Sequence, residues 1–309
     1  MTAIRLQPLT RGKVASLGDV GARWLAELPA VLAQLERTWS ITVGRPLPGG
    51  SCSYVARATR RNGEHLVLKV AVPNDDLAAQ VRTLERADGR GYVRLISFDR
   101  ARNAVLLESL GHPLERSGAS PEQQLATLAD TLRIAWRPVG DAPLPEPGQD
   151  KASGLHTLIA QLWPQLGHPG SERVVHQALE YADQLRTPDP EELVVVHGDP
   201  HPGNALAVPG RRPGAETGYC FVDPDGFVAD RAYDLGVALR DWVGRLGGDD
   251  ARATAERYAE LLAARSGVDL TRIWQWGYLE RVSTGLYVMS FGGIELGQGF
   301  LRSAQRLVD

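Results

Sequence analysis

Residues 195–204 read VVHGDPHPGN and residues 221–227 read FVDPDGF, and these two stretches decide the fold prediction. A short apolar run before His197 predicts a strand that ends in a polar loop. The apolar segments 205–208 and 219–222 flank a loop rich in glycine and arginine, which predicts a hairpin. The order is therefore strand, polar loop, two hairpin strands and an acidic turn.

This layout suits the transfer of a phosphoryl group to a hydroxyl. The reaction needs an acid beside the acceptor hydroxyl, and oxygen ligands that hold Mg²⁺ against the phosphates. Asp199, Asn204 and Asp223 have the types and the order of the catalytic-loop Asp, the catalytic-loop Asn and the metal-binding Asp of protein kinases. We therefore predict Asp199 as the catalytic residue and Asn204 and Asp223 as magnesium ligands.

The sequence His197-Gly198-Asp199, followed by four residues and Asn204, resembles the catalytic loop of the aminoglycoside phosphotransferase family. The resemblance implies an α+β, two-lobed, protein-kinase-like fold. Residues 1–110 would form a small nucleotide-binding lobe with an antiparallel sheet, and residues 111–309 a larger, mainly helical lobe with the acceptor pocket. The implied activity is ATP- and Mg²⁺-dependent phosphorylation of a hydroxyl on a small molecule.

Within that family the chain is most similar to the streptomycin and hydroxyurea phosphotransferase branch. The shared features are an N-terminal helix bearing tryptophans, the strand entry at 89–95 (GRGYVRL) and Asp223-Pro224 in the metal turn. The chain has Pro200 where the branch has leucine, and Pro202-Gly203 before Asn204. The resemblance implies a cationic acceptor of the streptomycin type, with hydroxyurea or another small metabolite as the alternative.

In the first lobe, Lys69 lies within an apolar strand, which is unusual for a lysine. Asn62-Gly63 predicts the tight turn before that strand, and residues 13–40 predict a helix that Pro29 starts or breaks. The resemblance implies that Lys69 binds nucleotide phosphates beneath a glycine-containing loop formed by Gly49, Gly50 and Ser51. The alternative is that the glycines form an ordinary turn and that Lys69 is a cation on an edge strand.

A capped helix is predicted over 74–91, and in the kinase plan this helix supplies an acid to the lysine. The position nearest the family's glutamate is Gln80, which is neutral, so we expect Asp76, one turn earlier, to be the partner. Glu108 and Leu110 would form the hinge that reads the adenine edge. The alternative for Glu108 is a solvated strand end.

Five residues of the second lobe have supporting assignments. We expect His197 to orient the loop, and the resemblance implies that Asp234 braces the loop through backbone hydrogen bonds. Asp225 either assists the metal or forms the turn. Asp230 and Glu280 are candidate carboxylates for a cationic acceptor, and the alternative for each is an exposed helix charge.

Composition excludes several classes of protein. A net charge of −3 over 309 residues gives no support for nucleic-acid binding, and no apolar stretch approaches the length of a membrane span. The N-terminus lacks the apolar core of a signal peptide. Two cysteines far apart in sequence predict neither a disulfide framework nor a zinc site. We expect a cytoplasmic protein, and a monomer.

Two other readings compete with a kinase. His197 and His201 have the spacing of a zinc pair on a helix, but Pro200 and Pro202 argue against a helix there. A nucleotide-binding pseudo-kinase would be expected to lose the base, a metal ligand or the lysine. The chain keeps all four candidate residues, which disfavours the pseudo-kinase. They are the base Asp199, the metal ligands Asn204 and Asp223, and Lys69.

Overall fold

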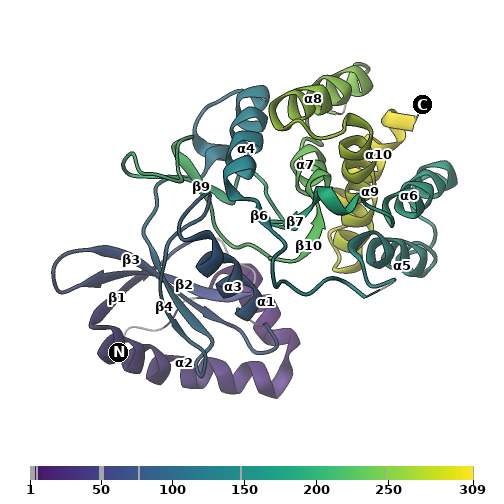
Figure 1. Cartoon of the computed structure of the whole chain (residues 1–309). Helices are drawn as coiled ribbons and strands as arrows, with labels where there is room; N and C mark the ends of the chain where they lie inside the picture. Colours follow the sequence, from purple (N-terminus) through teal and green to yellow (C-terminus); the bar gives the residue numbers. More distant parts are fainter. Residues whose placement is uncertain are drawn as a thin grey trace. The chain divides into compact units, whose positions relative to one another are not determined.

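The computed structural model describes residues 4, 6–48, 52–75, 77–146, 148–246 and 248–308. The chain divides into two compact units, Met1–Gly111 and His112–Asp309 (Figure 1). Each unit has its own core and is described separately. Within the described residues, no helix combines the length and the apolar character needed to cross a membrane.

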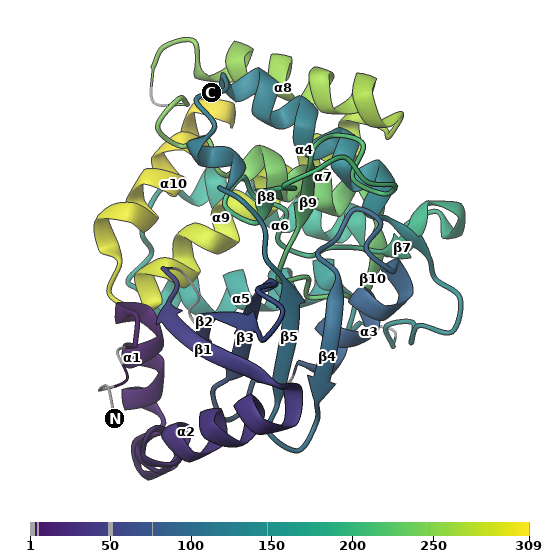
Figure 2. The same ribbon diagram turned by 90° about the vertical axis from the view of Figure 1, so that its left-hand side faces the viewer.

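The first unit is built on a five-stranded antiparallel sheet with the order β1-β2-β3-β5-β4 (Figure 2). Its strands are β1 (Ile41–Pro46), β2 (Ser53–Arg60), β3 (His65–Ala71), β4 (Leu95–Asp99) and β5 (Ala104–Glu108). Gly63 turns β2 into β3 at a φ of 87°, a left-handed conformation that glycine adopts without steric cost. The predicted hairpin at Asn62-Gly63 is confirmed.

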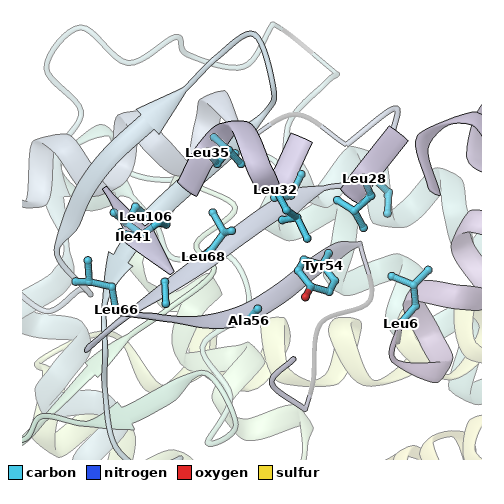
Figure 3. Close-up of a cluster of buried hydrophobic side chains, with 14 of the residues drawn as sticks. Leu6, Leu28, Leu32, Leu35, Ile41, Tyr54, Ala56, Leu66, Leu68 and Leu106 are labelled. Atoms are coloured by element: carbon cyan, nitrogen blue, oxygen red, sulfur yellow. The ribbon is translucent and has the colours of Figure 1, made fainter. Parts of the chain in front are cut away.

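Helix α2 (Gly18–Trp39) supplies the other half of this core, and α1 (Pro8–Ser16) precedes it. Leu28, Leu32 and Leu35 of α2 pack with Leu68 of β3 and with other buried residues of the sheet (Figure 3). Alternate residues of each strand face this cluster because strand side chains have a period of two.

The prediction that Pro29 starts or breaks the first helix is wrong. Pro29 lies inside α2, and the break lies at Gly18, where φ is 55°. The leucines around Pro29 pack on the sheet, and this tertiary packing outweighs the local cost of the proline. At Gly21 an added Cβ would lie 2.0 Å from the Val14 carbonyl oxygen, so α1 and α2 can meet closely only at glycine.

The remaining helix of this unit, α3 (Ala78–Ala87), is shorter than the predicted 74–91. It begins after Asn74, whose backbone is left-handed with a φ of 68°, and it ends at left-handed Asp88. One face of α3 is buried, including Gln80, Val81 and Leu84. This face directs Gln80 toward β3.

The second unit contains the two motifs at residues 195–204 and 221–227. Strand β7 (Leu193–Val195) lies between β6 (Arg137–Pro138) and β10 (Val228–Asp230), while β8 (Ala205–Ala207) and β9 (Tyr219–Phe221) form the predicted hairpin. The loop at 196–204 therefore connects β7 to the hairpin. Short 3₁₀ segments, η1 (Leu114–Arg116) and η2 (Pro190–Glu192), precede α4 and β7 respectively.

Helices make up most of the rest of this unit. Among them lies α9 (Leu270–Ser290), which is buried along much of its length (Figure 1). It packs against five other helices of the unit, namely α5 (Lys151–Gln165), α6 (Glu172–Leu185), α7 (Arg231–Arg240), α8 (Ala251–Ser266) and α10 (Ile294–Val308). Helix α4 (Pro121–Ala135) packs on α8.

Helices α7 and α9 cross closely at two glycines. A Cβ on Gly236 of α7 would lie 2.4 Å from Cβ of Trp276, and one on Gly277 of α9 would lie 2.9 Å from Cδ2 of Leu239. At Gly236 an added Cβ would also lie 2.7 Å from the backbone nitrogen of Gly277, so this position must be glycine for the helices to approach so closely. The crossing brings Arg240 on α7 next to Glu280 on α9, and both belong to the candidate site.

Candidate active site

The polar loop after β7 is held by Asp234, which lies in the first turn of α7. Its carboxylate accepts hydrogen bonds from the backbone N–H groups of His197 and Gly198, both at 2.9 Å, and from Nε1 of Trp136 at 2.9 Å. Asp234 is fully buried, and burial raises its pKa to about 6 even though the three donors oppose the shift. The carboxylate therefore fixes the two peptide groups immediately before Asp199.

The His197 ring ties the loop to the hairpin. Its Nδ1 accepts the backbone N–H of Asp199 at 3.0 Å, so its Nε2 carries the proton and donates to the Val222 carbonyl at 2.9 Å. Burial lowers the pKa of His197 to about 4, and the ring packs edge-on against Phe221. Both nitrogens are engaged with the backbone, so His197 orients the loop and offers no nitrogen to zinc.

Asp199 is held by an arginine that sequence reasoning missed. Arg240 donates from Nη2 to Oδ1 of Asp199 at 2.9 Å, and Nε2 of His201 lies 3.6 Å from Oδ2. Burial acts to raise the pKa of Asp199, but Arg240 and His201 outweigh it and hold the pKa below its usual value. At neutral pH the residue is a carboxylate whose Oδ1 is fixed by Arg240 and whose side chain is 41% exposed.

Arg240 pairs with three carboxylates. Besides Asp199 it reaches Asp241 at 2.6 Å and Glu280 at 3.4 Å. Only 13% of its side chain is exposed, and such burial is tolerated because several carboxylates share the charge. In the sequence, Arg240 is marked only by its position in the last turn of α7. Its contact with Glu280 depends on how α7 and α9 cross, which the sequence pattern does not reveal.

The two predicted magnesium ligands lie at one end of the β8–β9 hairpin. The Asn204 side-chain nitrogen donates to the Asp199 carbonyl at 3.0 Å, so the amide oxygen is the side-chain atom that could bind a metal. The Asn204 carbonyl accepts the backbone N–H of Val222 at 2.9 Å, so Asp223 comes next on the neighbouring strand. Asp223 is left-handed with a φ of 56°, a costly conformation that clusters at functional sites.

One amide oxygen and one carboxylate fit Mg²⁺, which retains water and phosphate oxygens as its other ligands. Among the described residues, no group of three or more His, Cys, Asp or Glu side chains is placed to hold a metal by itself. A metal held by Asn204 and Asp223 would take its further ligands from water or from a bound ligand. This donor set gives no support to the alternative of a zinc site.

Asp225 contacts the catalytic loop at His197 and Gly198. Its backbone N–H donates to the His197 carbonyl at 2.7 Å, and a Cβ added to Gly198 would lie 2.6 Å from the Asp225 Cβ. Gly198 has a φ of 98°, so glycine is required there for both conformation and space. Desolvation, followed by repulsion from Asp199, raises the pKa of Asp225 to about 6.

The two candidate acceptor carboxylates differ in position. Glu280, 4% exposed, accepts the Tyr233 hydroxyl at 2.8 Å and pairs with Arg240, which links it to Asp199. Asp230, 2% exposed, instead caps α7 through the backbone N–H of Ala232 at 2.8 Å and forms an ion pair with Arg272. These contacts give Asp230 a structural role and do not support its predicted contact with an acceptor.

In the first unit, Lys69 on β3 donates from Nζ to Oε1 of Gln80 on α3 at 3.1 Å. Both residues are buried. The residues predicted to partner the lysine and to cover the phosphates lie outside the described residues, namely Asp76, Gly49, Gly50 and Ser51. The structure thus places the neutral Gln80 against Lys69.

The predicted hinge lies at the end of β5. Oε1 of Glu108 accepts the backbone N–H of Arg94 at 2.8 Å, so its carboxylate joins β5 to the segment before β4. Leu110 follows β5 and is half-buried.

Comparisons with known proteins identify relatives of the chain. Residues 38–292 match the family model described as aminoglycoside/hydroxyurea antibiotic resistance kinase. Streptomycin 6-kinase of Streptomyces glaucescens is 27% identical over 97% of this chain and 96% of its own length. Hydroxyurea phosphotransferase of Kitasatospora aureofaciens is 26% identical over 94% of this chain and 82% of its own length.

Solved structures confirm the fold class. An aminoglycoside phosphotransferase from Streptomyces rimosus, solved with ADP and streptomycin, matches with a TM-score of 0.54 at 20% identity, over 82% of this chain and 97% of that one. The choline kinase LicA from Streptococcus pneumoniae matches with a TM-score of 0.59 at 14% identity, over 92% and 98%. The predicted kinase-like fold, with an antiparallel sheet in the N-terminal part and a helical C-terminal part, is confirmed.

Proposed function

Because the chain belongs to the aminoglycoside/hydroxyurea antibiotic resistance kinase family, and is therefore a phosphotransferase, we propose that it transfers the γ-phosphate of ATP to a hydroxyl of an aminoglycoside of the streptomycin type. The observation that carries this proposal is the loop at 197–204, where Asp234 fixes the backbone before Asp199 and Asn204 bonds the Asp199 carbonyl.

The reaction moves one proton and one phosphoryl group. The acceptor hydroxyl oxygen attacks the γ-phosphorus, the bond from that phosphorus to the oxygen of the ADP leaving group breaks, and the hydroxyl proton passes to Oδ2 of Asp199. Because Arg240 lowers the pKa of Asp199, the carboxylate orients the hydroxyl first and takes its proton as the new bond forms.

The remaining residues of the chain position the reactants. Asn204 and Asp223 would hold Mg²⁺, which supplies charge neutralisation on the phosphates when bound. Lys69, kept in place by Gln80, would contact phosphate oxygens as a point charge. The segment after Glu108 would present backbone groups to the adenine edge.

Charge around Asp199 supports a cationic acceptor. Asp225 and Glu280 add carboxylates near Asp199, and Arg240 already shares its charge among three acids. Excess negative charge at a site raises its affinity for cations such as ammonium or guanidinium groups. A neutral acceptor such as hydroxyurea would gain nothing from these carboxylates.

The experiment that tests the proposal is acceptor-dependent ADP release from Mg·ATP, with streptomycin, hydroxyurea and a simple sugar as acceptors. We expect turnover with streptomycin and a loss of about 10²–10⁴-fold in the Asp199→Asn variant. Asp249→Asn is the matched control, since Asp249 is fully exposed and its nearest cation, Arg306, is 3.7 Å away.

The alternatives predict other outcomes in the same assay. Turnover with hydroxyurea alone would assign the chain to the neutral-acceptor activity of its second relative. Binding of ATP without ADP release for any acceptor would support a pseudo-kinase. Wild-type turnover in Asp199→Asn would remove the catalytic role of Asp199.

A further inference from the structure

Lys151 holds its ammonium group over two aromatic rings near the catalytic loop. Nζ lies 5.3 Å from the ring centroid of Phe227 and 5.2 Å from that of Tyr233. The two rings meet edge to face at 5.4 Å, and Tyr233 meets Trp276 edge to face at 5.0 Å. A cation within about 6 Å of an aromatic centroid is attracted to the ring face, so these residues form a cation site.

The position of Lys151 on its helix is otherwise unfavourable. It is the first residue of α5, directly after the N-cap Asp150. The positive end of the helix dipole disfavours a cation in the first turn. The rings of Phe227 and Tyr233, together with the nearby charge of Asp225, offset this cost.

The cation site adjoins the catalytic loop. The Tyr233 hydroxyl reaches the Gly198 carbonyl at 3.2 Å, one residue before Asp199, and it also donates to Glu280 at 2.8 Å. The side chain of Asp225 covers Gly198. The Tyr233 hydroxyl and the Asp225 side chain therefore connect the cation site to the catalytic loop at Gly198.

We propose that the Lys151 ammonium occupies the subsite that receives a guanidinium or alkylammonium group of the acceptor, and that the acceptor cation binds by displacing it. This proposal rests on the proposed function and names the chemistry that the same site selects. The two cations cannot share one pair of rings, because like charges at such a distance repel.

Displacement is physically accessible. The Lys151 side chain is half-buried and has a flexible four-carbon stem, so its ammonium can move into water. A guanidinium is planar and less strongly hydrated than an ammonium, and it stacks on aromatic faces more readily. A guanidinium-bearing acceptor therefore gains more from the rings than the lysine loses.

The test compares Lys151→Met, which removes the charge at similar length, with Lys151→Arg, which keeps it. In Lys151→Met we expect the ratio of KM for streptomycin to KM for ATP to fall roughly threefold, because exposed cation–π contacts are worth about 0.5–1 kcal/mol. In Lys151→Arg the ratio should stay the same or rise. A ratio that is unchanged or raised in Lys151→Met overturns the proposal.

A second measurement does not depend on phosphoryl transfer. Tetramethylammonium chloride should raise the Tm of Lys151→Met more than that of the wild type, with sodium chloride at equal concentration as the reference. Adding Phe227→Leu to Lys151→Met should remove the extra shift. Equal shifts in the wild type and Lys151→Met overturn the cation site.

The two measurements separate this inference from the proposed function. A Tm shift specific to Lys151→Met, with no acceptor phosphorylated, supports the cation site while the proposed activity fails. Phosphorylation of streptomycin with equal KM ratios in all variants supports the activity and overturns the inference. If Lys151→Met does not fold, as judged by circular dichroism, Lys151→Gln takes its place in both measurements.

Discussion

The two units hold their key charged residues in different ways. In the first unit the cation Lys69 is held by a neutral amide 11 residues away in the sequence, on the next helix. In the second unit the anion Asp199 is held by a guanidinium 41 residues away, and that guanidinium also binds Asp241 and Glu280. The hydrogen bond from Lys69 to Gln80 is local and has a neutral acceptor, whereas the contacts of Asp199 with Arg240 are long-range and charged.

This contrast predicts which unit is sensitive to pH and to the loss of one side chain. An amide acceptor does not titrate, so the Lys69–Gln80 hydrogen bond has no acid-dependent partner. The Asp199 network combines buried carboxylates, an arginine and a histidine, and each of their ionisations depends on the others.

Removing the arginine should have the largest effect. Arg240→Met leaves the buried Glu280 without its cation, and breaking a buried pair from one side costs about 3–5 kcal/mol. It should also lower kcat by about 10²-fold, because Asp199 loses the donor that fixes Oδ1. Urea unfolding and steady-state kinetics measure the two effects.

The same variant tests the ionisation of Asp199. Because Arg240 lowers the pKa of Asp199, its removal should move the acid limb of the kcat/KM profile to higher pH. Arg240→Lys keeps a cation and should shift the limb less. An acid limb that stays in place in Arg240→Met would contradict the assignment of that limb to Asp199.

The buried histidine should make stability depend on pH between about 4 and 6.5. Its pKa is lowered to about 4 in the folded protein, so below pH 6.5 the unfolded chain takes up a proton that the folded chain does not. This contribution falls by up to about 3 kcal/mol as the pH drops through that window. Asp225 and Asp234, whose pKa values are raised, act in the opposite direction.

The His197→Asn variant isolates this term. The difference in unfolding free energy between wild type and variant should be largest near pH 7 and should shrink toward pH 4.5, as measured by urea titrations at several pH values. A difference that is constant with pH would show that His197 titrates alike in the folded and unfolded states.

The neutral pair should give the smallest effect. Gln80→Leu removes one acceptor for Lys69 and should raise KM for ATP by about tenfold, because one hydrogen bond to a charged group is worth about 1.5–3 kcal/mol. Gln80→Glu keeps an acceptor and should retain activity. A gain of tenfold or more in kcat/KM for Gln80→Glu would show that the neutral partner limits the wild-type protein.

Local sequence patterns predicted much of the fold. The Asn62-Gly63 turn and the hairpin between 205–208 and 219–222 depend on nearby residues, and both are present. The spacing of the loop also placed Asp199 and Asn204 together, since they share one turn of chain. Pro29 misled because its local cost is outweighed by packing of α2 on the sheet.

The remaining features depend on contacts between distant residues. Arg240 and Glu280 meet only because Gly236 and Gly277 let two helices approach. Lys151 reaches Phe227 from a helix that begins far earlier in the chain, and no spacing rule connects the two. Asp230 was a candidate acceptor carboxylate, with an exposed helix charge as the alternative. In the structure it is buried and caps the N-terminus of α7.

The most direct test of the central claim is ³¹P NMR of streptomycin incubated with Mg·ATP and either the wild-type protein or Asp199→Asn. We predict a phosphate ester on streptomycin with the wild type and none with the variant over the same time, while both proteins bind ATP. An ester formed at equal rates by both proteins, or ATP bound by the wild type with no ester formed, would contradict the account.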